Sequence, residues 1–215
     1  MARSVQNRRR NAWIIAASAL VIAVGYGIVN SSFRGEPLPL ETWWMAVVTP
    51  GKVTPWLTPS LVLHEIGAGL PAFVIASAVT GALFLWKRPW GALYFASAAI
   101  VSTLVVEVMK NTIGRPRPTD ALIDVGYGSY PSGHSARAAM IAVALGILLP
   151  RLWVRMLGAA YTLAMMFSRT QLGAHWLLDT VAGALVGAAV ALLCFAALAD
   201  KLGAEGAKGH PPPWR

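Results

Sequence analysis

The feature that most constrains this chain is a series of apolar runs long enough to cross a lipid bilayer. A membrane-spanning helix needs about 20 mostly apolar residues for about 30 Å of hydrocarbon. Four runs meet this need: residues 12–29, 61–86, 92–109 and 176–199. Two shorter runs, 136–149 and 153–167, are joined by the Pro150-Arg151 turn and span if their polar ends extend to the headgroups. The pattern predicts an all-α, polytopic membrane protein with six transmembrane helices in a bundle.

Composition and charge placement agree with this prediction. The chain has 215 residues, of which 56% are apolar and 13% charged, and this excludes a soluble globule of ordinary composition. A net charge of +9 would suggest nucleic acid as the partner of a soluble protein. Here the basic residues instead cluster between alternate spans, as cytoplasmic loops prefer. Eleven of them fall on one side: Arg3, Arg8, Arg9, Arg10, Lys87, Arg88, Arg151, Arg155, Lys201, Lys208 and Arg215. Both termini are therefore expected in the cytoplasm.

The predicted domain is single and covers residues 1–200. Its first run resembles a signal peptide in having a basic start, but "GIVNSSFRGE" offers no A-x-A-like cleavage site, so an uncleaved first helix is expected. Cys194, the single cysteine, lies in the last span and cannot form an intramolecular disulfide. Residues 201–215 are rich in Gly and Pro and are predicted to form a disordered cytoplasmic tail.

Three connections should lie on the extracytoplasmic side. The 31–60 loop is broken by prolines and is expected to hold one short interfacial helix around 40–48, with Trp43 and Trp44 at headgroup level or acting as a lid. The other two, 110–134 and 168–176, carry most of the polar residues near the spans. Alternating topology brings these sequence-distant segments to one membrane face, which predicts a site there.

The cations of these segments indicate an anion-binding site. Lys110, Arg115, Arg117 and Arg169 have no matching carboxylate cluster nearby, and a dianionic phosphate suits such donors. The "YPSGHSARAAM" stretch adds a helix N-terminus, where Ser132, Gly133 and free N–H groups suit phosphate oxygens. The sequence contains no Cys/His metal cluster, and no cofactor is expected.

Two histidines suit two roles in phosphoryl transfer. His175 and Asp179 are four residues apart and share a helical face, so the carboxylate can fix the imidazole tautomer and leave a lone pair for nucleophilic attack. His134 has no local partner and suits a general acid that protonates the departing oxygen. We expect phosphoryl transfer through a phosphohistidine, stabilised by the surrounding charge.

Four further charges near the spans have structural interpretations as well. Glu107 precedes Lys110 by three residues and is expected to pair with it. An interfacial hydrogen bond is favoured over a substrate contact for His64 and Glu65, whereas Arg137 either leans into the site or reaches the headgroups.

Three spaced motifs resemble the type 2 phosphatidic acid phosphatase superfamily. They are Lys110 followed after six residues by Arg117-Pro118, the Pro131–His134 segment "PSGH", and Ser168-Arg169 followed by His175 and Asp179. The resemblance covers residues 110–179 by motif and implies a metal-independent, six-helix membrane phosphatase.

The resemblance also implies residue roles. His175 would be the nucleophile, Asp179 its orienting partner and His134 the general acid. The phosphate oxygens would be held by a second group: Lys110, Arg117 and Arg169, with Ser132 and Gly133 assisting. Arg115 lies outside the fixed motif positions and is a possible additional phosphate ligand.

The expected function is hydrolysis of a lipid phosphate or diphosphate at the outer face of the cell membrane. A polyprenyl diphosphate such as undecaprenyl diphosphate is favoured, then phosphatidate or phosphatidylglycerol phosphate. The substrate and membrane lipids are the expected partners, with no nucleic acid; protein partners and oligomeric state are left open. Alternatives are a lipid-linked phosphotransferase using the same phosphohistidine, vanadate-dependent haloperoxidase chemistry, and a non-catalytic protein that binds lipid headgroups.

Overall fold

A computed structural model of the protein describes residues 2–49 and 55–207. Every regular element in these two ranges is an α-helix. The helices are α1 (Ala2–Ser32), α2 (Pro39–Val48), α3 (Leu57–Gly67), α4 (Gly69–Leu85), α5 (Pro89–Ile113), α6 (Gly133–Leu148), α7 (Leu152–Gln171) and α8 (Leu177–Ala207). The predicted all-α fold is confirmed.

Within the described ranges, three helices are long and apolar enough to cross a membrane: α1, α5 and α8. The α3–α4 pair qualifies as a fourth span if its two helices, bent by 63°, count as one. α6 is apolar but has only 16 residues, and α7 carries Arg155 and Arg169 and does not meet the criterion. The protein is thus a multi-pass membrane protein with three or four candidate spans by this measure, and the six spans stay a prediction.

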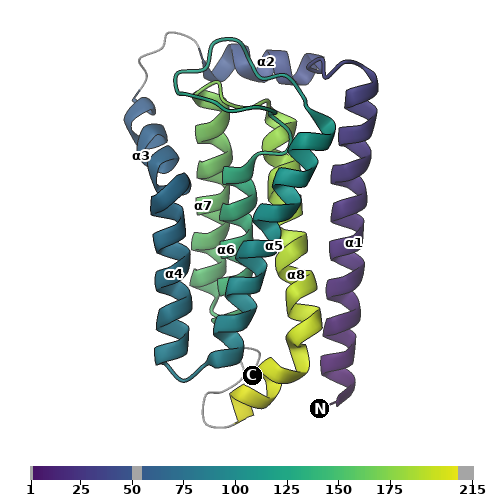
Figure 1. The fold of residues 1–215 in the computed structure, drawn as a ribbon, viewed down its shortest axis with the longest axis vertical. Helices are drawn as coiled ribbons and strands as arrows, with labels where there is room; N and C mark the ends of the chain where they lie inside the picture. The colour runs from purple at the N-terminus through teal and green to yellow at the C-terminus, as the bar shows by residue number, and fades with distance from the viewer. Residues whose placement is uncertain (1, 50–54, 208–215) are drawn as a thin grey trace.

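The helices run alternately up and down in one bundle (Figure 1). The start of α1, the α4–α5 turn, the α6–α7 turn and the end of α8 lie at one end. The end of α5 and the starts of α6 and α8 lie at the other, beneath the crossing helix α2. Three segments far apart in the sequence therefore come together at the end that α2 covers.

Small residues allow the central helices α6 and α8 to pack closely. A Cβ on Gly187 would lie 1.9 Å from the Ala136 carbonyl oxygen, and one on Gly183 would lie 2.2 Å from that of Ser132. Only glycine fits at such distances, a common device in membrane helix packing. Large apolar side chains instead face outward, among them Phe73, Leu85 and Leu104. Small residues inside and large ones outside suit a bundle surrounded by lipid.

The connection over residues 31–60 contains the expected short helix. α2 spans Pro39–Val48 and confirms the predicted helix at 40–48; Pro39 stands in its first turn, where a missing N–H costs nothing. The loop is shorter than expected because α3 already begins at Leu57. Residues 50–54 of the loop lie outside the described ranges.

The disordered tail was predicted to begin at residue 201, but residues 201–207 are helical. α8 continues through residues 201–207, where Leu202 is buried and the Glu205 carboxylate accepts hydrogen bonds from the backbone N–H groups of Trp90 (2.7 Å) and Gly91 (3.2 Å). Glu205 also lies 3.8 Å from Arg88. These contacts with the start of α5 keep the segment helical, despite its glycines. Residues 208–215 lie outside the described ranges.

Candidate active site

His175 lies in the short turn between α7 and α8 and is nearly buried, at 4% exposure. Its Nδ1 is 2.7 Å from the carbonyl oxygen of Ser129 and 3.7 Å from Oδ2 of Asp179. A carbonyl oxygen can only accept, so Nδ1 carries the proton and Nε2 keeps its lone pair. The predicted tautomer is therefore present, but the Ser129 carbonyl holds it more closely than Asp179 does.

The electrostatic surroundings keep this imidazole neutral. Burial lowers the pKa of His175, and the cations Arg117 and Lys110 act in the same direction. The hydrogen bond and negative charge of Asp179 oppose them without reversing the shift. A neutral ring with an unprotonated Nε2 is the form that a histidine nucleophile needs.

Arg117 lies against the unprotonated nitrogen of His175. Its Nη1 lies 3.4 Å from Nε2 of His175 and donates to the carbonyl oxygen of Ala174 at 2.6 Å, while its Nε donates to that of Gly126 at 2.7 Å. Two carbonyl groups thus hold the guanidinium beside the nucleophile. Oxygens of a phosphoryl group in front of Nε2 would meet this fork of donors.

Asp179 is fully buried at the start of α8 and has two close partners. Its Oδ1 accepts from Nη1 of Arg115 at 2.6 Å, and its Oδ2 accepts from the backbone N–H of Trp176 at 2.8 Å. Its carbonyl oxygen accepts from the backbone N–H of Ser132 at 2.9 Å. Asp179 therefore joins the "PSGH" segment to the turn that carries His175.

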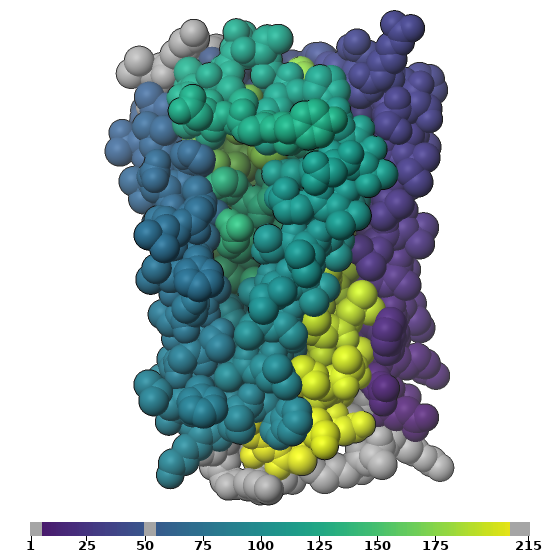
Figure 2. Space-filling view, viewed as in Figure 1, coloured from purple at the N-terminus to yellow at the C-terminus, as the bar shows by residue number. Residues whose placement is uncertain are grey.

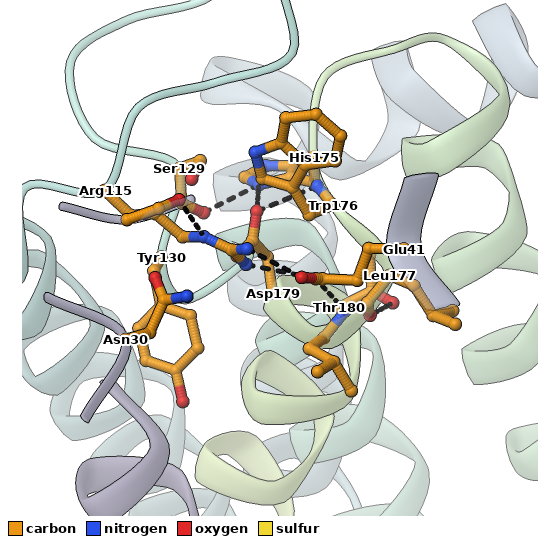
Figure 3. A network of polar contacts seen from close by, with 12 residues as sticks. Asn30, Glu41, Arg115, Ser129, Tyr130, His175, Trp176, Leu177, Asp179 and Thr180 are labelled. Carbon is orange, nitrogen blue, oxygen red and sulfur yellow. Dashed lines mark hydrogen bonds and ion pairs between the residues drawn. The ribbon is translucent and has the colours of Figure 1, made fainter. Parts of the chain in front are cut away.

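Arg115 was a possible phosphate ligand, and the structure gives it a different place (Figure 3). Its guanidinium is buried and donates to Gly35, Glu41 and Asp179. Burial disfavours the charge, but the two carboxylates outweigh it and raise the pKa of Arg115. Because two of its partners are carboxylates that neutralise its charge, Arg115 holds the site together from behind instead of facing a substrate.

Glu41 was missed in the sequence. It lies on α2, has 0% exposure and binds both terminal nitrogens of Arg115, at 3.1 and 2.7 Å. The signal available was a lone acidic residue in the apolar, Trp-containing segment "PLETWWMAVV". Neither the motifs nor helical periodicity connects it with residue 115.

His134 lies in the first turn of α6 and contacts a second histidine. Its Nε2 lies 3.2 Å from the carbonyl oxygen of His64, and the two rings have centroids 5.3 Å apart. Nδ1 of His64 accepts from Nη1 of Arg169 at 2.9 Å. His64 was expected to make a hydrogen bond at the membrane interface, and the structure shows that its hydrogen bonds are with two predicted site residues.

The remaining predicted residues lie around these contacts. Arg169 is fully buried and donates to the hydroxyl of Ser168 at 2.6 Å. A Cβ on Gly133 would be 3.9 Å from Nζ of Lys110, so this lysine faces the N-terminus of α6. Lys110 also lies 3.7 Å from Glu107, and this confirms their predicted pairing.

The predicted site residues form one cluster. His134 lies within electrostatic range of His175 and Arg169, and Lys110 lies within range of Arg117. Arg137, one turn after His134, donates to the carbonyl oxygen of Gly67 and so leans toward the site. No three His, Cys, Asp or Glu side chains cluster as metal ligands do within residues 2–49 and 55–207.

Comparison with known proteins agrees with the three motifs. Residues 91–202 match the family model described as PAP2 superfamily. A lipid A 1-phosphatase of Rhizobium johnstonii is 31% identical over 152 residues, which are 64% of this chain and 60% of the relative. An undecaprenyl-diphosphatase of Sulfolobus acidocaldarius is 37% identical over 78 residues, 36% of this chain and 34% of the relative. The chain thus spans about 60% or less of the length of these curated relatives.

The fold has a counterpart among solved structures. The transmembrane PAP2-type phosphatidylglycerolphosphate phosphatase of Bacillus subtilis superposes with a TM-score of 0.67 at 21% identity. The match covers 85% of this chain and 96% of that one. The two proteins share the helical arrangement at low sequence identity.

Proposed function

The chain belongs to the PAP2 superfamily, and from this premise we propose that it hydrolyses a lipid phosphate or diphosphate through a phosphohistidine. The observation that carries the proposal is the state of His175. Its Nδ1 is held by the Ser129 carbonyl at 2.7 Å, and its Nε2 faces Arg117 at 3.4 Å. A fixed lone pair beside a guanidinium fork suits attack on a phosphorus atom.

The proposed reaction has two steps. Nε2 of His175 forms a bond to phosphorus while the bond from phosphorus to the leaving oxygen breaks, and His134 donates a proton to that oxygen. Water then attacks the phosphohistidine, with His134 taking a proton from it, and releases phosphate and free His175. Arg117, Lys110 and Arg169 would bind the phosphate oxygens through both steps.

A groove between α4, α5 and α6 suits the hydrocarbon part of such a substrate. It encloses about 980 Å³ and is lined by apolar side chains such as Phe73, Leu93 and Met140. Gly133 and Arg137 also line it, which connects it to the site. Figure 2 shows the hollow between α4 and α5. A lipid with its chains in the groove would present its headgroup at the N-terminus of α6.

The proposed topology has six spans, with α3–α4, α6 and α7 crossing beside α1, α5 and α8. Both termini would then be cytoplasmic and the site would face the outer side of the cell membrane. The alternation of the helices and the basic residues at the end opposite the site support this orientation (Figure 1).

Among lipid phosphates, we favour a polyprenyl diphosphate such as undecaprenyl diphosphate, followed by phosphatidate and phosphatidylglycerol phosphate. The relatives named for lipid A and for undecaprenyl diphosphate are both phosphatases of amphiphiles. A site at the membrane surface selects such substrates by location.

Phosphate release from a panel of these lipids in detergent tests the proposal. We expect hydrolysis by the full chain to survive EDTA, because arginine and lysine supply the charge, and to fall to background in His175→Ala. Asp124→Asn, an exposed change in the 110–134 loop, should retain activity. Activity in His175→Ala, or hydrolysis that EDTA abolishes in the wild type, would contradict the proposed mechanism.

A further inference from the structure

The Glu41 carboxylate is unusually well supplied with donors. It is fully buried, although it lies on α2, outside the bundle of long helices. Its donors come from three other parts of the chain and from its own helix start: both terminal nitrogens of Arg115, the backbone N–H of Leu178 (3.1 Å), the hydroxyl of Tyr26 (3.4 Å) and the backbone N–H of Leu38 (3.0 Å). So many partners indicate that the ionised form is required here.

In this network one guanidinium, that of Arg115, donates hydrogen bonds to two carboxylates. Arg115 binds Glu41 through Nη1 and Nη2 and Asp179 through Nη1 (Figure 3). The three side chains together carry one net negative charge. Without Glu41, Arg115 would neutralise Asp179, and the carboxylate nearest the His175 ring would lose its effect. The network therefore leaves Asp179 able to stabilise positive charge that develops on the imidazole.

Glu41 also fixes the position of the chain around Asp179 through hydrogen bonds. Its Oε1 accepts from the N–H of Leu178, the residue before Asp179, and so fixes the first turn of α8. Nη1 of Arg115 then reaches Asp179 at 2.6 Å. A second bond, from the indole N–H of Trp44 to the hydroxyl of Thr170 at 3.0 Å, ties α2 to the end of α7. α2 thus contacts the chain on both sides of the turn that carries His175.

We propose that Glu41 is a positioning residue for the hydrolysis proposed above, acting on His175 through Arg115 and Asp179. The effect of Glu41 on catalysis rests on the proposed function. The effect of the Glu41 charge on the titration of His175 can be measured whether or not the protein hydrolyses a lipid phosphate.

The first test compares Glu41→Gln with Glu41→Asp in the full chain. We expect Glu41→Gln to lower kcat by roughly ten- to a hundredfold with little change in KM, as loss of an outer partner of a catalytic group does. Glu41→Asp keeps the charge and should restore part of kcat. Glu36→Gln is the matched control, because Glu36 is an exposed acidic residue five positions away. Thermal unfolding in detergent monitors folding of each variant.

The second test reads the charge of His175 directly. The chain has four histidines, so ¹⁵N-histidine NMR with a His175→Ala reference assigns the His175 signal. The charged or titratable groups that act on this ring are Asp179 from α8, Arg117 from the loop before α6, Lys110 from α5 and His134 from α6, with Arg115 behind Asp179. Glu41→Gln removes a negative charge behind Asp179 and should move the His175 titration to lower pH. Glu36→Gln should leave it in place.

The outcomes separate the possibilities. A lower kcat in Glu41→Gln with a His175 titration moved to lower pH supports positioning through charge. Wild-type kcat and titration in Glu41→Gln would overturn the proposal. An equal loss of kcat in Glu41→Gln and Glu41→Asp, with an unmoved titration, would assign Glu41 to folding of α2 alone and also overturn it. A moved titration in a protein that hydrolyses no lipid phosphate would retain the charge relation and reject the proposed function.

Discussion

At the residue scale, we expect the site to depend on the negative charge of Asp179, which is fully buried. Both of its oxygens accept from fixed donors, Arg115 and the N–H of Trp176. An asparagine has one acceptor oxygen and one donor NH₂ group. In either orientation, its NH₂ would face another donor.

We therefore expect Asp179→Asn to reduce kcat more than it raises KM, because the imidazole loses its nearby negative charge. The unsatisfied buried donor should also lower the free energy of unfolding by about 1–3 kcal/mol. Steady-state kinetics and thermal melts of the variant check both effects. Asp120→Asn is a suitable control because Asp120 is exposed. Wild-type kcat in Asp179→Asn would show that its charge is dispensable.

At the element scale, the contact between α6 and α8 sets the geometry of the site. Gly187 of α8 meets the backbone of Ala136, two residues after His134. Because both partners are helix backbone, an added methyl group can be accommodated only if the helices separate. Separation would also move Ser132 and His134 relative to His175.

Gly187→Ala should therefore destabilise the protein by about 1–3 kcal/mol, the usual cost of overpacking, and reduce phosphate release. Gly25→Ala in α1 is the matched control, since nothing lies within 4 Å of the added Cβ. That change should be neutral or raise the melting temperature, because alanine favours helix by about 1 kcal/mol over glycine. Equal melting temperatures for the two variants would contradict this account of the α6–α8 contact.

At the scale of the whole molecule, the proposed topology predicts opposite sides for the two ends of the bundle. In a Cys194→Ser background, single cysteines can replace Asp124, in the connection before α6, and Arg151, at the α6–α7 turn; both are exposed. We expect a membrane-impermeant maleimide to label Asp124→Cys in intact cells and Arg151→Cys only after permeabilisation. If the maleimide labelled both cysteines from the same side, residues 124 and 151 would lie on one side of the membrane. The proposed topology, in which α6 crosses between them, would then be wrong.

Hydropathy and motif spacing were enough to predict the helical class, the short helix at 40–48 and the residues that gather around His175. These are local properties, since an apolar run or a four-residue spacing reports on one helix. The number of spans stays a prediction, because helix length and composition confirm only three or four. α6 and α7 are short or interrupted by charge, and the α3–α4 bend lies at Gly67–Gly69, which the continuous apolar run 61–86 does not reveal.

The partners of the site residues depended on tertiary structure alone. Glu41 and Arg115 are 74 residues apart, Arg115 and Asp179 are 64, and His64 and Arg169 are 105. No periodicity relates residues at such separations, because their contact depends on how α2, α3 and α8 pack against the loops. The sequence therefore determined which groups could carry the chemistry. Packing decided that Arg115 supports Asp179 from behind and that Glu41 balances the charge of Arg115.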